Sequence, residues 1–263
     1  MMPQEGNAAL GVQLNLGRSF DALMIDLDGT MVDTLGDFVA ALNLVLEELP
    51  WHPQERALAG LPLASAVIEA MVGKGSEHLI QSALMHVLRL SAAAPASPAS
   101  GASSDALMRV RAEALYAPAW ASYQRHYLAI NGLHASLYPG VMQGLQQWHA
   151  QGLPMACLTN KPLAFAQQLL KMKGLDAYFR QVFGGDSFER KKPDPMPLLK
   201  TCEALCSTPA RTLMLGDSSN DARAARAAGC PVVLVTYGYN HGQPIRAVDA
   251  DGFVDSFAEL ALR

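Results

Sequence analysis

The 263-residue chain lacks the features of several large classes of protein. It has no apolar run near the roughly 20 residues that a membrane-spanning helix needs. Residues 1–19 lack the charged start and apolar core of a signal peptide. Lys and Arg total 20 against 24 Asp and Glu, for a net charge of −4, and no basic stripe is visible. We therefore expect a cytoplasmic protein that binds neither membranes nor nucleic acid.

Cysteine is scarce, and its spacing matches no known type of site. No CxxC pair occurs, and no pair of histidines accompanies the cysteines as zinc ligands would require. We expect buried, reduced thiols. Two nucleotide-binding signatures are also missing, because Gly73-Lys74-Gly75-Ser76 lacks the Walker spacing and no segment follows GxGxxG. The four cysteines are Cys157, Cys202, Cys206 and Cys230.

A pair of carboxylates follows the first predicted buried strand. The apolar run Phe20 to Ile25 is typical of such a strand, and Asp26-Leu27-Asp28-Gly29-Thr30 comes directly after it. Gly29 allows a sharp exit from the strand. Open α/β sheets bind ligands at the carboxyl ends of their strands, and two neighbouring carboxylates are costly unless a cation or a shared proton offsets them. The segment therefore predicts a site of this kind.

Three further polar segments follow in order along the chain. Leu158-Thr159-Asn160-Lys161 offers a hydroxyl and backbone N–H groups to a phosphate oxygen. Lys191-Lys192-Pro193-Asp194-Pro195 offers an ammonium that can neutralise a phosphoryl group and an anionic side chain together. Gly216-Asp217-Ser218-Ser219-Asn220-Asp221 ends an apolar run with carboxylates, which suit Mg²⁺. The four segments together predict a phosphoryl-transfer site.

These segments resemble the four motifs of the haloacid dehalogenase superfamily, in its phosphatase branch. The resemblance implies that Asp26 attacks phosphorus to give an aspartyl-phosphate intermediate. It implies that Asp28 protonates the leaving alkoxide and then deprotonates the hydrolytic water. It further implies a Mg²⁺ cofactor bound by Asp26, the backbone carbonyl of Asp28, and Asp217.

The same resemblance gives supporting roles to four other residues. Thr159 and Asn160, with the neighbouring amides, are expected to bind the phosphoryl oxygens of the substrate. Lys192 is expected to pair with Asp26 and the phosphate, and it is preferred over Lys191 because it directly precedes Pro193. Asp221 is expected to orient Lys192 or a metal-bound water.

The distance between the first two motifs predicts an inserted domain. More than a hundred residues separate Asp28 from Pro154, far more than one crossover helix needs. Their apolar spacing is helical over residues 35–49, 63–72, 77–90 and 106–130, with Thr34 as a possible N-cap. We predict an α/β fold, with a doubly wound, mainly parallel, Rossmann-like core over residues 1–33 and 137–263. A helical cap over residues 34–136 would contain a flexible low-complexity loop at 91–104. A last helix is expected over Phe257 to Leu262, with Ser256 as its N-cap.

Peripheral segments narrow the resemblance to bacterial phosphoglycolate phosphatases. They are Met71-Val72-Gly73-Lys74-Gly75, Tyr237-Gly238-Tyr239-Asn240-His241-Gly242 and Asp255-Ser256-Phe257. The implied reaction is hydrolysis of 2-phosphoglycolate, a small phosphorylated metabolite, to glycolate and phosphate. Lys74 is the only lysine of the predicted cap, so it or the adjacent amides are expected to contact the substrate when the cap closes. An exposed lysine in a solvated turn is the alternative.

Other activities stay open at this point. A sugar-phosphate phosphatase would share most of the motifs. A phosphomutase resembling β-phosphoglucomutase would return the phosphoryl group to a sugar hydroxyl instead of water. A phosphonatase would need a cap lysine for a Schiff base, and a non-catalytic phosphate-binding protein would keep the fold without turnover. The sequence leaves monomer and homodimer equally open.

Overall fold

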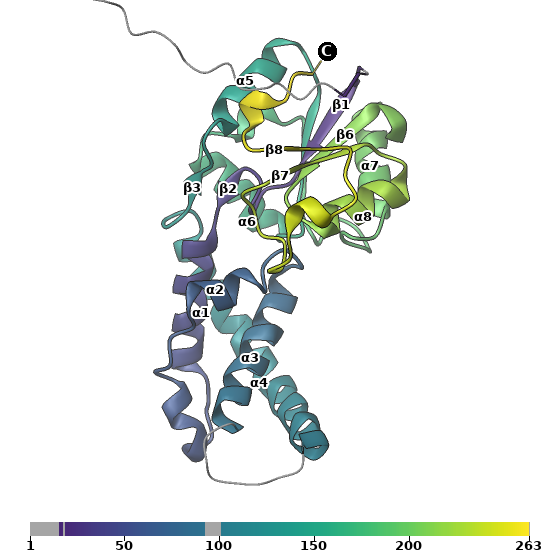
Figure 1. Ribbon diagram of the computed structural model, residues 1–263. Coiled ribbons are helices and arrows are strands. Elements are labelled where there is room, and N and C mark those ends of the chain that lie inside the picture. Colours follow the sequence, from purple (N-terminus) through teal and green to yellow (C-terminus); the bar gives the residue numbers. More distant parts are fainter. Residues whose placement is uncertain (1–15, 18, 93–100, 263) are drawn as a thin grey trace, which may run out of the picture.

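The centre of the molecule is a parallel six-stranded sheet (Figure 1). The computed structural model describes residues 16–17, 19–92 and 101–262. The strand order is β5-β4-β1-β6-β7-β8, and every neighbouring pair is parallel. This sheet and the helices around it confirm the predicted α/β fold class. The strands are β1 (Ala22–Ile25), β4 (Met155–Leu158), β5 (Gln181–Phe183), β6 (Thr212–Gly216), β7 (Val232–Val235) and β8 (Gly252–Val254).

Helices cover both faces of the sheet, which explains why its inner strands are apolar throughout. Successive side chains of a strand point to opposite faces. Leu23 and Ile25 accordingly belong to one apolar cluster, and Met24 belongs to another. Since neither face meets water, an inner strand needs no polar alternation. The first cluster includes α5 (Val141–Ala150) and α6 (Leu163–Met172), and the second includes α7 (Met196–Ala204) and α8 (Ser219–Ala228).

The direction of strand addition reverses at β1. After β1 the chain passes through the helical insertion to β4 and β5 on one side, and then returns to β6 on the other side. The connections that leave β1 and β6 therefore diverge, and they open a crevice at the carboxyl ends of the strands. Ligands of open α/β sheets bind at this kind of switch point.

A separate helical cap extends away from the strand ends (Figure 1). Its longest helix, α4, packs against α1 and α3, and these helices share an apolar cluster. Phe165 and Tyr239 of the core also belong to that cluster. The antiparallel ribbon of β2 (Val32–Asp33) and β3 (Ser136–Leu137) joins the two connections to the core, next to the predicted domain boundaries. The cap helices are α1 (Leu35–Glu48), α2 (Ser65–Glu69), α3 (Ser76–Ala92) and α4 (Gly101–Ile130).

Three predicted elements differ in length from the observed ones. The helix expected over 63–72 is only Ser65–Glu69, and the last helix is a single turn, Phe257–Glu259. Phe257 and Leu260 both pack into the sheet cluster. Residues 93–100 of the predicted 91–104 loop lie outside the described residues, whereas α4 already begins at Gly101.

The start of α1 is held by residues from outside the helix. Thr34 occupies the predicted N-cap position, although its side chain makes no capping hydrogen bond. Instead Tyr239 Oη accepts hydrogen bonds from the N–H groups of Thr34 (3.0 Å) and Leu35 (3.1 Å). The buried carboxylate of Asp37 accepts from the N–H of Gly132 (2.6 Å) and of His134 (2.7 Å). Both connections between core and cap are therefore fixed to α1.

The cysteines are free thiols, as expected, but one of them is not in the core. Cys157, Cys202 and Cys230 are buried, whereas Cys206 is exposed. The expectation for Cys206 fails because α7 ends at Ala204, and Cys206 takes a left-handed turn with φ of 54°. Among the residues that the structure describes, no helix combines the length and the hydropathy that a bilayer span requires.

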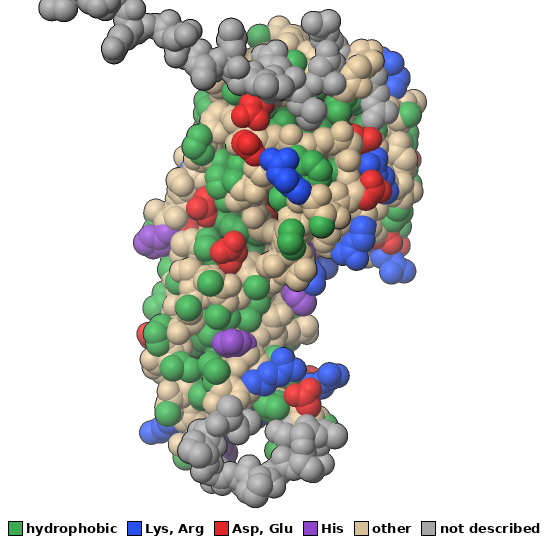
Figure 2. All heavy atoms as spheres, in the orientation of Figure 1, with side chains coloured by type: hydrophobic (Ala, Val, Ile, Leu, Met, Phe, Trp, Pro, Cys, Tyr) green, Lys and Arg blue, Asp and Glu red, His purple; other side chains and the backbone are tan. Residues whose placement is uncertain are grey.

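Charges of opposite sign lie next to each other on the surface. Figure 2 shows Lys and Arg side chains near Asp and Glu on the face drawn, over core and cap alike. Ion pairs at the surface of the core join Arg211 to Asp21, and Arg226 to Asp249 and Asp251. Exposed pairs of this kind add little to stability, at about 0–1 kcal/mol each.

Candidate active site

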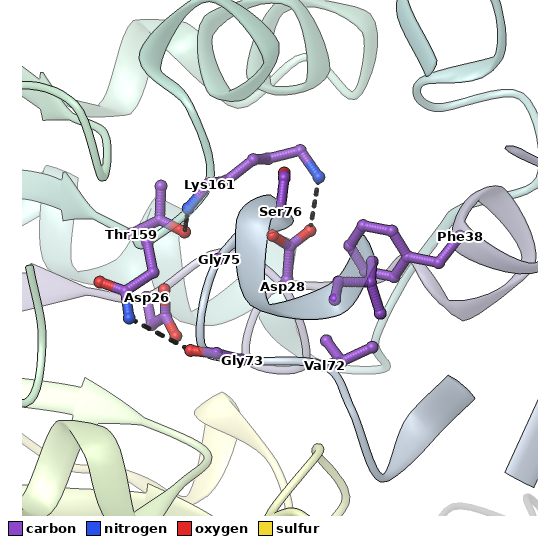
Figure 3. A pocket seen from close by; sticks show the side chains of 11 residues that line it. Asp26, Asp28, Phe38, Val72, Gly73, Gly75, Ser76, Thr159 and Lys161 are labelled. Carbon is purple, nitrogen blue, oxygen red and sulfur yellow. Dashed lines mark hydrogen bonds and ion pairs between the residues drawn. The ribbon is translucent and has the colours of Figure 1, made fainter. Parts of the chain in front are cut away.

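The sequence motifs meet at the carboxyl end of the sheet, under the cap. Asp26 follows β1, Thr159 follows β4 and Asp217 follows β6. A cavity of about 30 Å³ lies between core and cap (Figure 3). The core lines the cavity with Asp26, Asp28, Thr159, Asn160 and Lys161, and the cap with Phe38, Val72, Gly73, Gly75, Ser76 and Leu79.

Asp26 is a buried carboxylate that is held from two sides. One of its oxygens, Oδ1, accepts the N–H of Leu27 at 2.8 Å and lies 3.1 Å from Lys192 Nζ. Burial raises the pKa of Asp26 to about 7, and the charge of Lys192 opposes this shift. A cation bound beside Asp26 would favour its ionised form, which is the nucleophilic one.

Lys192 is the lysine that faces the site. Its ammonium lies 2.7 Å from Asp221 Oδ1 and donates to the Leu158 carbonyl at 2.8 Å. Burial lowers the pKa of Lys192, but the carboxylates of Asp221 and Asp26 outweigh that effect, so the pKa is raised overall and the charge is kept. Lys191, the alternative weighed from the sequence, pairs with Glu77 of the cap at 2.8 Å.

Three carboxylates form a cluster that fits a divalent cation. Asp26, Asp217 and Asp221 each offer an oxygen, and these atoms lie within 4.8 Å of one another. Burial raises the pKa of Asp217, and the charges of Asp221 and Asp26 raise it further. One ammonium, that of Lys192, pairs with two of these three acids. The remaining negative charge and the all-oxygen donor set suit Mg²⁺.

Asp221 already has protein donors on both of its oxygens. Oδ1 pairs with Lys192, while Oδ2 accepts from the Ser218 hydroxyl at 2.8 Å and the Ser218 N–H at 3.1 Å. These bonds fix Asp221 at the start of α8, where it completes a capping box with Ser218. The geometry therefore suits a residue that positions Lys192.

Two glycines enclose Asp217. Gly29 has φ of +83°, and a Cβ there would lie 2.0 Å from Asp217 Oδ2. A Cβ at Gly238 would lie 2.4 Å from the same atom. The N–H of Tyr239 donates to this oxygen at 2.6 Å. Gly238 and Tyr239 were missed as site residues, although the sequence marked their segment as part of the narrower resemblance.

Asn160 joins the motif segments to the cap. Its side-chain amide donates to the Gly73 carbonyl at 3.2 Å and to the Lys192 carbonyl at 2.9 Å. Asn220 donates to the same Gly73 carbonyl at 3.1 Å. The Thr159 hydroxyl oxygen accepts the Lys161 N–H at 3.2 Å, so its own O–H is a donor for the cavity.

Comparison with known proteins agrees with this arrangement. Residues 20–229 match the sequence model of the haloacid dehalogenase-like hydrolases. The chain belongs to this family. A protein of Thiobacillus denitrificans named phosphoglycolate phosphatase is 42% identical over 92% of this chain and 94% of its own length. A protein of Nitrosospira multiformis with the same name is 41% identical over 90% of this chain and 92% of its own length.

Solved structures show the same architecture. The crystal structure described as a predicted phosphoglycolate phosphatase from Haemophilus somnus has a TM-score of 0.76 and 29% identity. The matched region covers 91% of this chain and 96% of the chain in that crystal structure. The predicted family, the capped α/β fold and the predicted hydrolase class are thus confirmed for this haloacid dehalogenase-like hydrolase.

Lys74 is not among the residues that line the cavity of this hydrolase. Its side chain is exposed, whereas its neighbours Gly73 and Gly75 line the cavity. Both glycines have positive φ, at 102° and 92°, so the turn brings its backbone toward the core and directs the lysine outward. The sequence predicted a contact either by the Lys74 ammonium or by the neighbouring backbone amides. In the structure the backbone of the turn lies at the cavity, and the Lys74 ammonium does not.

The lysine that reaches the cavity is Lys161. Its ammonium lies 2.9 Å from Asp28 Oδ1 and 2.5 Å from Tyr127 Oη, and the residue is 4% exposed (Figure 3). Lys161 was quoted as part of the second motif but received no role. The available signal was its position, since it is a charged residue only three places past the apolar core of a buried strand.

Proposed function

We propose that this hydrolase is a Mg²⁺-dependent phosphatase that hydrolyses 2-phosphoglycolate to glycolate and phosphate. The observation that carries the proposal is the pair Asp26 and Asp28, which lines a cavity between core and cap beside the Lys192 ammonium. The names of the relatives at 34–42% identity support the choice of substrate.

Asp26 is the proposed nucleophile. An oxygen of its carboxylate attacks phosphorus, the bond from phosphorus to the ester oxygen breaks, and an aspartyl-phosphate forms. Lys192, 3.1 Å from Asp26, lowers the cost of bringing a phosphate anion to this carboxylate. When bound, Mg²⁺ offsets the negative charge of the phosphoryl oxygens. Its proposed ligands are Asp26, Asp217 and the backbone carbonyl of Asp28.

Asp28 is the proposed acid and base. It donates a proton to the ester oxygen as glycolate leaves, and it then takes a proton from the water that attacks the aspartyl-phosphate. Asp28 lies in the same turn as Asp26 and lines the same cavity. The Thr159 hydroxyl and the amides around Asn160 are the proposed donors to the other phosphoryl oxygens, and Asp221 keeps Lys192 in place.

The test is release of phosphate in the presence of Mg²⁺ from a panel of 2-phosphoglycolate, sugar phosphates and nucleoside monophosphates. Asp26→Asn is the matched control, because it keeps the shape of the side chain and removes the nucleophile. Selective turnover of 2-phosphoglycolate that is lost in Asp26→Asn and in chelator supports the proposal. Preference for a sugar phosphate would replace the substrate, and isomerised sugar phosphate without free phosphate would indicate a phosphomutase.

A further inference from the structure

Lys161 is a buried ammonium at the end of the cavity that holds Asp28. It is 4% exposed, and Figure 3 shows its ammonium and the Asp28 carboxylate pointing toward each other, with Ser76 beside them. Removing an ammonium from water costs several kcal/mol unless partners offset the loss. A lysine kept at such a position therefore needs either a structural or a ligand-binding reason.

The partners of this ammonium come from both parts of the molecule. Lys161 and Asp28 belong to the core, whereas two aromatic rings belong to the cap. The ammonium lies 4.9 Å from the ring centroid of Phe38 and 4.7 Å from that of Tyr127, within reach of cation–π attraction. The two rings stack with centroids 5.5 Å apart. We call these rings, with Asp28, the Lys161 cage.

The cage leaves hydrogen-bonding capacity for a ligand. An ammonium has three N–H donors. Among the described residues, Asp28 and Tyr127 accept two of them. Lys161 also lines the cavity directly. One N–H donor of the ammonium is thus available at the cavity wall.

The chemistry of the proposed substrate places an anion beside this charge. One methylene separates the carboxylate of 2-phosphoglycolate from the ester oxygen that Asp28 would protonate. A group in contact with Asp28 is therefore close to the carboxylate of a bound substrate. Lys161, at 2.9 Å from Asp28, satisfies this condition, whereas Lys74 is exposed outside the cavity lining.

We propose that Lys161 binds the carboxylate of the substrate and thereby selects short phosphomonoesters that carry a carboxylate over those with a neutral end. This inference rests on the proposed function and adds the residue that sets its specificity. A phosphomonoester with a neutral end offers no anionic acceptor to the third N–H donor of this buried ammonium, and sites built in this way discriminate strongly against such analogues.

The test compares 2-phosphoglycolate with 2-hydroxyethyl phosphate, which has a neutral hydroxymethyl group in place of the carboxylate. The ratio of the two kcat/KM values is measured for the wild type, Lys161→Met, Lys74→Met and, as a control, Lys171→Met, which removes an exposed lysine of α6. We expect Lys161→Met to lower the ratio about 10- to 100-fold, in keeping with loss of a charge-assisted contact. Lys171→Met is expected to keep the wild-type ratio.

Several results would overturn the inference. Equal losses on both esters in Lys161→Met would mean that Lys161 only positions Asp28. Collapse of the ratio in Lys74→Met alone would give the role to the cap lysine. The wild type supplies a test that does not depend on whether a variant folds, because equal kcat/KM values for the two esters would contradict selection for a carboxylate. Turnover of other esters with none of 2-phosphoglycolate would instead refute the proposed substrate, which is a separate outcome.

Discussion

The core and the cap contribute to the same cavity with different kinds of groups. The core supplies charged side chains at strand ends, and each is held by several partners, as Asp221 is held by Lys192 and Ser218. The cap supplies backbone at Gly73 and Gly75 and aromatic rings such as Phe38. The chemistry therefore depends on the core, while closure of the cavity depends on the cap.

The packing follows the same division. The sheet clusters are buried on both faces by helices of the core alone, and the cap has an apolar cluster of its own. Only Phe165 and Tyr239 among the core residues belong to the buried part of the cap cluster described here. Displacing the cap therefore exposes little of the apolar interior that keeps Asp26, Asp217 and Lys192 in place.

The sharpest test of this division is Asp26→Asn. We expect a loss of kcat of about 10⁴-fold or more, as found when an essential nucleophile is removed. The fold should be kept, because the substitution preserves side-chain volume, so the variant should still unfold in one cooperative transition. The measurement is phosphate release under saturating substrate, together with a thermal melt. Activity within tenfold of the wild type would show that the chemistry does not depend on this carboxylate.

Gly29→Ala tests the packing around the core site. Its Cβ would meet Asp217 Oδ2 at 2.0 Å, so we expect displacement of that carboxylate and a loss of kcat/KM of about 10²-fold or more, as misplacement by about 1 Å can cause. Gly174→Ala is the matched control, since Gly174 also has positive φ (+69°) but meets nothing within 4 Å. The control should lose about 1–2 kcal/mol of stability from the left-handed conformation and keep its activity. Equal activity losses in the two variants would reject the steric argument.

The raised pKa of Asp26 predicts how the metal-free protein responds to pH. Its pKa in the folded state, about 7, lies above the usual value of about 4. Between these two pH values the native state therefore binds a proton that the unfolded state has released. The stability that Asp26 contributes is lost as the pH rises from about 4 to 7. Asp26→Asn does not titrate at this position. In chelator, the unfolding free energy of the wild type should therefore fall by about 2–4 kcal/mol relative to that of Asp26→Asn as the pH rises from about 4 to 7.

Denaturant unfolding at several pH values measures this difference. A constant difference between the two proteins would contradict the raised pKa. Addition of Mg²⁺ at pH 7 should raise the melting temperature of the wild type more than that of Asp26→Asn, because the cation favours the ionised carboxylate.

The smallest effect is expected on the cap side, for Asn220→Ala. This change removes one of two hydrogen bonds to the Gly73 carbonyl, and a neutral bond contributes about 0.5–1.5 kcal/mol. We expect KM to rise roughly 3- to 10-fold with little change in kcat. Steady-state kinetics on 2-phosphoglycolate measure the split. A large fall in kcat at constant KM would place Asn220 with the chemical groups of the core and weaken the division between the two parts.

The sequence predicted most of the core because its signals are local. Each buried strand is an apolar run, and the polar residue that follows it must lie at the carboxyl end of the sheet. This rule places Asp26, Thr159 and Asp217 together. The rule that open α/β sheets bind ligands at the carboxyl ends of their strands needs no knowledge of contacts between distant segments. The family resemblance favoured Lys192 over Lys191, because Lys192 directly precedes Pro193, and the structure places Lys192 against Asp26.

The residues that could not be predicted depend on contacts between distant segments. Lys161 and Tyr127 are 34 positions apart, and no local pattern pairs them. Tyr239 binds the start of α1 across more than 200 positions, and no local pattern at Thr34 could show this. For Lys74, composition could not show which side of the turn faces the core, because that depends on the positive φ of both flanking glycines.

The turn at Gly73 has a kinetic consequence. Opening this turn alone breaks two neutral hydrogen bonds, to Asn160 and Asn220. A cost of a few kcal/mol keeps the open form at about 0.1–10% of molecules. Because Gly73 lines the cavity, ligands that pass this turn exchange only through the open minority, and their association rate is reduced in proportion to its population. Weakening the turn would accelerate both arrival and departure of ligands without altering any group that performs the chemistry.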